Sequence, residues 1–225
     1  MLGQLPLGVA RRTHALRLRL QATRLGRQPQ EALKTARLLA KHQAFSKVAA
    51  LGLLRSLAFE SLATAHDADQ LRQVWLQFEG VDRRDAFVAA RAAHCAAAFG
   101  AHEEARNWLR PFWERLTELS VDERAAVALA LVDAVAGIGP EWLPRLEAAL
   151  TAFARESAVV LAVGSALAER QLWGKARALL EDAAADPTLA AAARRHACLT
   201  LARIADEEDD AARASRCYEQ AARIG

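Results

Sequence analysis

Apolar residues recur at three- and four-residue spacing along nearly the whole chain, which is the pattern of amphipathic α-helices. Strict alternation, the pattern of a half-buried strand, occurs only in LRLRL at 16–20, and no turn signal or β-rich partner flanks it. Glycine, proline and acidic clusters interrupt the helical pattern at regular intervals. This pattern predicts about twelve helices, at 9–25, 29–43, 47–65, 67–79, 84–98, 101–118, 121–136, 140–154, 157–170, 173–184, 188–206 and 209–223.

The helices follow a repeat of about 34 residues, the length of the helix–turn–helix unit of tetratricopeptide arrays. In the repeat at 157–190, Gly164, Ala176 and Ala183 fall where the two helices of that unit cross, and Leu180 lies between the two alanines. A hairpin of this size cannot bury its apolar face alone and stacks on copies of itself. We therefore predict an all-α, tetratricopeptide-like superhelix of six antiparallel helix pairs in a single domain, 1–225. Its approximate repeats are 12–45, 52–82, 86–119, 121–156, 157–190 and 195–225, of which the first two match the template less well.

Composition supports closely packed helices. Hydrophobic residues make up 53% of the chain, much of it alanine, and aromatic residues only 6%. No apolar run approaches the roughly 18 residues of a membrane span. Cys95, Cys198 and Cys217 are odd in number and have no paired spacing, so we expect three small buried side chains and no disulfide framework.

Charge is unevenly distributed along the chain. Residues 1–59 contain 11 basic residues against Glu31 alone, whereas the rest of the chain has a net charge of −7. Such a basic segment is attracted to an anionic lipid surface, an acidic partner or a nucleic acid. We expect a protein partner and an anionic membrane surface, and no nucleic acid. A solvated arginine-rich helical face explains the same charge.

The sequence contains no recognisable catalytic or metal-binding motif. GIGPEW at 137–142 lacks the preceding strand and the lysine of a phosphate-binding loop. His102 is followed by two glutamates but by no second histidine at helical spacing, so a metal site there is not expected. Trp75, Trp108, Trp113, Trp142 and Trp173 are expected to wedge between helical layers. We therefore expect no enzyme activity, no cofactor and no metal.

In an array of this kind the first helices of successive repeats line a concave groove. Groove positions share one face of each first helix because they recur at three- and four-residue spacing. We expect this groove to bind a peptide or helix of a partner protein. The candidate contact residues are Arg24, Ser56, Glu60, Thr64, His94, Ser165, Glu169, His196 and Arg203.

Four segments carry a resemblance to a known family: EALKTARLLAKHQAFS (31–46), DADQLRQVW (67–75), AHEEARNWLRPFW (101–113) and RQLWGKARALLEDAA (170–184). They resemble the C-terminal tetratricopeptide region of the proteobacterial HemY family, most specifically at 172–176. The resemblance implies an association with late haem and porphyrin metabolism. It also implies an inner-membrane protein with N-terminal anchor helices and a repeat region on the cytoplasmic side. Residues 1–225 lack such anchors, so we expect a soluble fragment.

The resemblance favours a non-enzymatic scaffold that holds haem-pathway enzymes at the inner membrane by binding them in the groove. Two alternatives stay open. One is a general adaptor for envelope or secretion assembly. The other is direct binding of porphyrin or haem in the groove, with His94 or His196 as the ligand.

Overall fold

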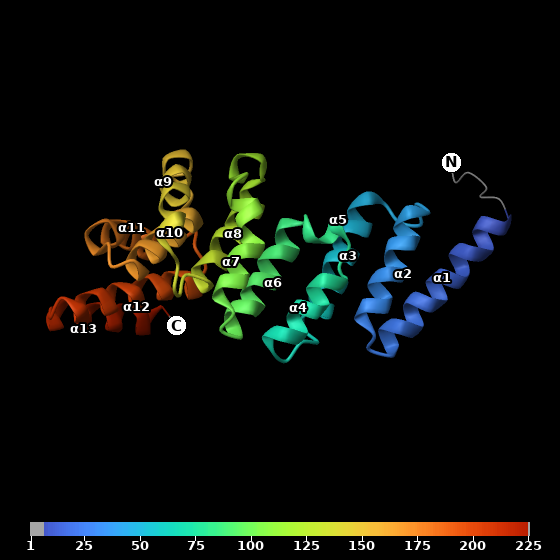
Figure 1. The fold of residues 1–225 in the computed structure, drawn as a ribbon, viewed down its shortest axis with the longest axis horizontal. Helices are drawn as coiled ribbons and strands as arrows, with labels where there is room; N and C mark the ends of the chain where they lie inside the picture. The colour runs from blue at the N-terminus through green and yellow to red at the C-terminus, as the bar shows by residue number, and fades with distance from the viewer. Residues whose placement is uncertain (1–6, 225) are drawn as a thin grey trace. The chain divides into compact units, whose positions relative to one another are not determined.

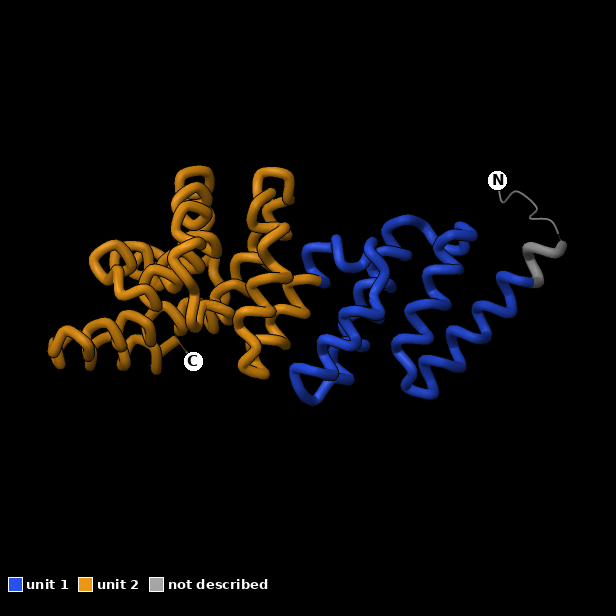
Figure 2. Tube along the Cα trace, viewed as in Figure 1, with its two compact units in different colours: residues 1–88 blue, residues 89–225 orange. Residues whose placement is uncertain are grey.

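The described part of the chain is entirely α-helical. The computed structural model describes residues 7–224, with side chains from residue 12, and no strand occurs in that range. Consecutive helices pack beside one another in pairs, as the sequence predicts (Figure 1). The chain divides into two compact units, Met1–Val88 and Ala89–Gly225 (Figure 2). One continuous domain over 1–225 stays a prediction.

Unit 1 is built of long helices that pack in sequence order, α1 on α2, α2 on α3 and α3 on α4. Two of their starts carry side-chain caps: Ser46 accepts a hydrogen bond from the amide of Ala49, and Asp67 from that of Gln70. Such caps satisfy amides that have no partner within the helix. The bounds are α1 Leu7–Leu25, α2 Pro29–Lys41, α3 Lys47–Leu62, α4 Ala68–Gln77 and α5 Gly80–Arg83.

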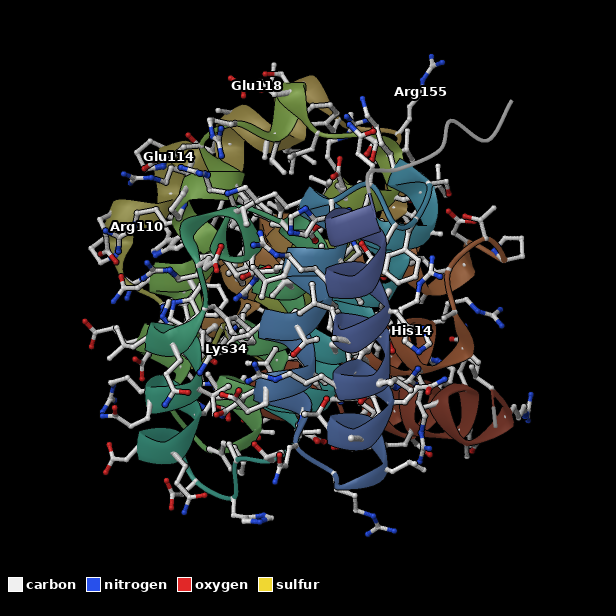
Figure 3. All side chains as sticks on the ribbon, turned by 90° about the vertical axis from the view of Figure 1, so that its right-hand side faces the viewer. His14, Lys34, Arg110, Glu114, Glu118 and Arg155 are labelled. Carbon is white, nitrogen blue, oxygen red and sulfur yellow. The ribbon has the colours of Figure 1, made fainter. Side chains whose placement is uncertain are left out.

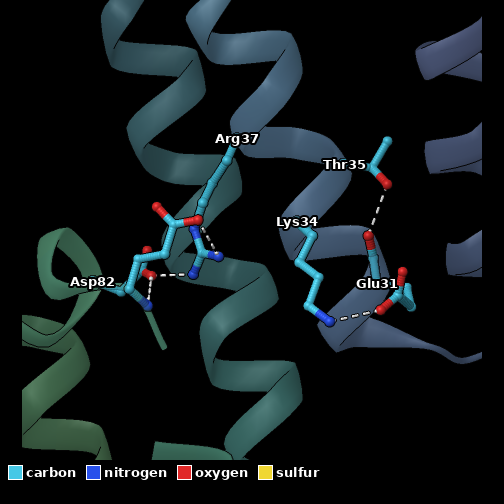
Figure 4. A network of polar contacts seen from close by, with 6 residues as sticks. Glu31, Lys34, Thr35, Arg37 and Asp82 are labelled. Carbon is cyan, nitrogen blue, oxygen red and sulfur yellow. Dashed lines mark hydrogen bonds and ion pairs between the residues drawn. The ribbon is translucent and has the colours of Figure 1, made fainter. Parts of the chain in front are cut away.

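The four-residue helix α5 is not among the predicted helices, and a polar network explains it. The Arg37 guanidinium on α2 donates to the Asp82 carboxylate and, at 3.2 Å, to Glu79 (Figure 4). The Asp82 carboxylate also accepts from the backbone amide of Glu79. The side chains of Arg37 and Asp82 are only 11% and 5% exposed. A buried ion pair across 45 residues therefore fixes this turn.

Unit 2 contains the remaining helix pairs. The first three residues of helix α6 belong to unit 1, and the helix is joined to α7 by a turn in which Gly100 has φ of +77°. Glycine adopts this left-handed conformation without steric cost. The bounds are α6 Ala86–Ala98, α7 His102–Trp113, α8 Val121–Asp133, α9 Leu143–Ala152, α10 Ser157–Glu169, α11 Trp173–Ala185, α12 Ala191–Glu207 and α13 Ala211–Arg223, with 3₁₀ turns at Leu116–Glu118 and Pro140–Trp142.

The hairpin of α10 and α11 shows why small residues stand at the predicted crossing points. A Cβ atom built on Gly164 would lie 3.1 Å from Cγ of Leu180, so a larger residue there would require the leucine side chain to move by a few tenths of an ångström. Ala176, Leu180 and Ala183 on the facing side of α11 are all buried. These positions of the repeat at 157–190 are confirmed.

Twelve of the thirteen described α-helices coincide with predicted ones, but several ends differ. The helix predicted over 101–118 ends at Trp113, two residues after Pro111, and a 3₁₀ turn follows. The helix predicted over 140–154 begins with a 3₁₀ turn at Pro140 and becomes α-helical only at Leu143. Both changes occur at prolines.

Ion pairs join neighbouring hairpins of unit 2. Arg124 binds both carboxylate oxygens of Glu156, at 2.6 Å for the closer one, and its guanidinium lies over the ring of Phe153. Arg145 binds Glu114 at 2.9 Å. Figure 3 shows Arg110 and Glu114 pointing away from the helices.

The buried tryptophans fulfil the expected role in part. Trp75, Trp113 and Trp142 are buried, and the rings of the last two meet edge to face at 6.3 Å. Trp108 and Trp173 are half-buried.

Of the cysteines only Cys198 is fully buried, so the expectation of three buried thiols is wrong for Cys95 and Cys217. No described helix is both long and apolar enough to span a bilayer.

Candidate functional site

A cavity of about 650 Å³ lies in unit 2, where helices α6, α8, α10 and α12 come together. We call this cavity the groove. Its apolar lining consists of Ala97, Ala98, Val132, Val135, Ala136, Ala168, Trp173 and Ile204. Its polar lining consists of His94, Asp133, Ser165, Glu169, Gln171, His196, Thr200, Arg203 and Glu207. Cavities of this size, apolar with a few polar groups, are typical of binding sites.

The first helices of four successive hairpins line the groove. Five of the nine candidate residues are in its wall, namely His94, Ser165, Glu169, His196 and Arg203. Their common position follows from the helical spacing that placed them on one face of each first helix.

The other four candidate residues lie in unit 1. Ser56 donates to Glu60 at 3.2 Å on α3, and the Thr64 hydroxyl donates to the backbone carbonyl of Ser61 at 2.7 Å. Arg24 is exposed near the end of α1. These four residues do not line the groove, and their role in binding stays a prediction.

His94 and Asp133 form a close pair across α6 and α8. Nδ1 of His94 lies 2.7 Å from a carboxylate oxygen of Asp133, and the two side chains are 52% and 43% exposed. A carboxylate at this distance favours the tautomer with the proton on Nδ1. In that tautomer Nε2 is an acceptor that a ligand in the groove can use.

His196 lies deeper in the groove. Nε2 of His196 is 3.4 Å from the hydroxyl of Ser165, which is itself buried. Burial lowers the pKa of His196, the nearby Arg203 lowers it further, and Asp133 acts in the opposite direction. His196 is therefore neutral at pH 7. Arg203 also donates to the hydroxyl of Thr200 at 3.0 Å, one turn back on α12.

Three carboxylates of the groove share an unusual location. Asp133, Glu169 and Glu207 are the last residues of α8, α10 and α12 respectively. A helix C-terminus carries a partial negative charge, so an acidic residue there costs about 0.3–1 kcal/mol relative to a favourable cation. None of the three helices has a basic residue in its last turn.

A side chain of α7 stabilises the turn that follows α8 in the groove wall. The buried Arg106 donates from Nη1 to the carbonyls of Ala134 and Ala136, at 2.7 and 2.6 Å. The amide of Gly137 in the same turn donates to the Glu169 carboxylate at 2.8 Å. Arg106 therefore fixes the turn that in turn orients Glu169.

Five further residues line the groove although the sequence did not predict them, namely Asp133, Glu207, Thr200, Trp173 and Gln171. Glu169, which ends α10, was selected, but the corresponding last residues of α8 and α12, Asp133 and Glu207, were not. An acidic residue at the end of three successive first helices was the signal that could have identified Asp133 and Glu207.

The polar groups of the groove do not form a catalytic relay. Serine attack needs one histidine that receives the serine proton and is itself oriented by a carboxylate. Here Ser165 contacts His196, whereas the carboxylate of Asp133 contacts His94. Within the residues that the structure describes, no cluster of three or more metal-ligating side chains occurs.

Comparisons with known proteins assign no family to this chain. No protein-family model matches the sequence, and no curated protein or solved structure matches it. The similarity to the HemY family stays a prediction from the four segments quoted above.

Proposed function

We propose that this chain is a non-enzymatic scaffold that binds a segment of a partner protein in the groove. The observation that carries the proposal is the groove itself, a cavity of about 650 Å³ whose wall comes from four successive helices. Its apolar lining residues can bury side chains of the partner, and its polar lining residues can fix their direction. The separation of Ser165 and Asp133 onto different histidines supports a binding role over catalysis.

The first test blocks the groove with a bulky side chain. Ala168→Trp places an indole in the groove wall, and Ala178→Trp on the exposed side of α11 is the matched control. A random dodecapeptide library is panned on the full chain, and the most enriched peptides are labelled with fluorescein. We expect anisotropy to show binding to the wild type and to Ala178→Trp, with loss of at least tenfold in affinity for Ala168→Trp. Equal binding by both variants would refute a groove site.

The resemblance to the HemY family supports a place for this scaffold in late haem and porphyrin metabolism at the inner membrane. A photo-crosslinking residue in place of Ala98, at the groove wall, tests the pathway in cells. Crosslinks to haem-pathway enzymes that are lost in Ala168→Trp would support a role of the scaffold in the haem pathway. Groove-dependent crosslinks to envelope or secretion proteins alone would instead favour the general adaptor.

The charge of unit 1 supports a second contact, with an anionic membrane surface. This unit contains 14 basic and 7 acidic residues, and Arg12, Arg17, Arg19 and Arg24 on α1 are exposed. Each basic residue close to an anionic surface contributes about 1 kcal/mol of attraction. Vesicle flotation tests it: binding should rise when phosphatidylglycerol is added to phosphatidylcholine, and equal binding to both would reject the contact.

Haem binding is a second candidate function because of the pair of His94 and Asp133. A carboxylate that orients Nδ1 leaves Nε2 available for iron, and the cavity has the volume of a ligand site. The charge of the groove lining opposes haem binding. The two propionates of haem would face three carboxylates, with Arg203 as the one cation of the lining. Titration with haem decides: a Soret shift lost in His94→Ala supports binding, and its absence rejects it.

A further inference from the structure

The groove is acidic, and the arrangement of its carboxylates indicates the kind of partner that it accepts. Asp133, Glu169 and Glu207 give the lining three negative charges, against the single positive charge of Arg203. The three carboxylates and Arg203 together give the lining a net charge of −2. The C-termini of α8, α10 and α12, which end at these residues, add partial negative charge at the same place.

Several carboxylates elsewhere in unit 2 form ion pairs with arginines, and within the described side chains those of the groove do not. Glu114, Glu156 and Glu208 each form an ion pair with an arginine of a neighbouring helix. Within the described side chains, by contrast, Asp133 contacts His94, Glu169 accepts from a backbone amide, and Glu207 has no ion pair. A carboxylate accepts several hydrogen bonds, so all three retain capacity for a cationic ligand.

The rest of the lining suits the stem of a basic side chain. Trp173 is half-buried in the wall, and Ala168 and Ile204 add apolar surface around it. Lysine and arginine bury their methylene stems against such surface while the charged head reaches a polar rim, and an indole face also attracts the cation.

We propose that the groove binds an extended polypeptide segment whose lysine or arginine side chains contact Asp133, Glu169 and Glu207. This inference rests on the proposed function and specifies the chemistry of its partner. Packed helices lie about 8–10 Å apart, and an extended chain advances about 3.3 Å per residue. Helix α10 packs against both α8 and α12, so basic residues about three positions apart match the row of carboxylates.

The peptides enriched from the dodecapeptide library test this charge preference. We expect them to carry a net positive charge, with lysine or arginine recurring about every third residue. Glu169→Gln and Glu207→Gln should each weaken the best labelled peptide by about two- to fivefold, as measured by anisotropy. Asp182→Asn removes an exposed carboxylate of α11 outside the groove and should leave the dissociation constant unchanged. Raising the salt concentration should weaken binding, because exposed charges are screened.

The outcomes separate this inference from the proposed function. Neutral or acidic peptides that bind the wild type and fail to bind Ala168→Trp would overturn the charge preference and leave the scaffold in place. Basic peptides whose affinity is the same for Glu169→Gln, Glu207→Gln and the wild type would also overturn it. Enriched peptides that bind Ala168→Trp as tightly as the wild type would overturn both the charge preference and the proposed binding in the groove.

Discussion

Arg106 stabilises the turn after α8 that forms part of the groove wall. It lies on α7 with 7% of its surface exposed, and its guanidinium donates to the carbonyls of Ala134, Ala136 and Gly137. These carbonyls follow the end of α8, where no amide of the helix can reach them. Burial lowers the pKa of Arg106, yet the guanidinium stays charged at pH 7 and gives the C-terminus of α8 the cation that its own last turn lacks.

Arg106→Met keeps most of the aliphatic stem and removes the charge with all three hydrogen bonds. The bond to Ala134 is buried and the other two are partly buried, and a buried carbonyl left without a donor costs about 1–3 kcal/mol. The relief from burying a charge offsets part of this loss. We therefore expect the free energy of unfolding of unit 2 to fall by about 3 kcal/mol. Peptide binding should weaken as well, because the same turn orients Glu169.

Arg110→Met is the matched control on the same helix. Arg110 points outward (Figure 3), and the hydrogen bond it donates to a side chain runs to Asn107 at 2.9 Å. Its loss should cost less than about 0.5 kcal/mol. Urea unfolding followed by tryptophan fluorescence reports on unit 2, which holds four of the five tryptophans. Equal unfolding midpoints for the two variants would show that Arg106 does not support the wall as described.

Three further predictions concern packing, a buried ion pair and pH. Gly164→Val should lower the free energy of unfolding by about 1–3 kcal/mol through overpacking, whereas Gly174→Ala, which meets nothing within 4 Å, should change it little in urea unfolding. Arg37→Met should destabilise unit 1 by about 3–5 kcal/mol because the buried Asp82 carboxylate loses its cation, and adding Asp82→Asn should restore part of the melting temperature. Wild-type stability should fall as the pH drops below about 6.5, and His196→Asn should flatten this dependence in unfolding experiments across that range.

The sign of the pH dependence follows from the lowered pKa of His196. Burial disfavours its charged form first, and the charge of Arg203 adds to this. The unfolded chain therefore binds a proton more readily than the folded chain. The stability is fully present above the unfolded pKa of about 6.5 and is lost as the pH falls through the lower folded value. A wild-type curve no steeper than that of His196→Asn would contradict this assignment.

Local signals account for most of the fold that the sequence predicts. Caps such as Ser46 and Ser120, and breaks such as Gly100, set helix boundaries from neighbouring residues alone. Helical spacing places His94 and His196 on the faces that line the groove, since residues three or four apart share one side of a helix. Both signals are contained within about one helical turn, so a single sequence reveals them.

The features that the sequence did not predict depend on contacts between distant residues. Helix α5 is fixed by Arg37, 45 residues before Asp82. The turn after α8 is fixed by Arg106, about 30 residues earlier. Nothing in the local pattern around 80–83 or 134–137 shows these partners. Asp133 and Glu207 were missed for another reason, because their role depends on the ends of three helices meeting at one cavity.

The carboxylates that end α8, α10 and α12 oppose a local rule that other helices of the chain obey. Helices α2, α7 and α13 carry Lys41, Arg110 and Arg223 in their last turns, as the helix dipole favours. Departures from such rules concentrate at functional sites, where stability is given up for binding.

This conflict makes Glu207→Lys informative. A lysine at the end of α12 should raise the free energy of unfolding by about 0.3–1 kcal/mol, because it complements the helix C-terminus. The same substitution reverses one charge of the groove and should shift the enriched dodecapeptides from basic towards neutral. Urea unfolding and a second panning measure the two effects on one protein. A variant that gains stability and still selects basic peptides would mean that the carboxylate of Glu207 does not contact the partner.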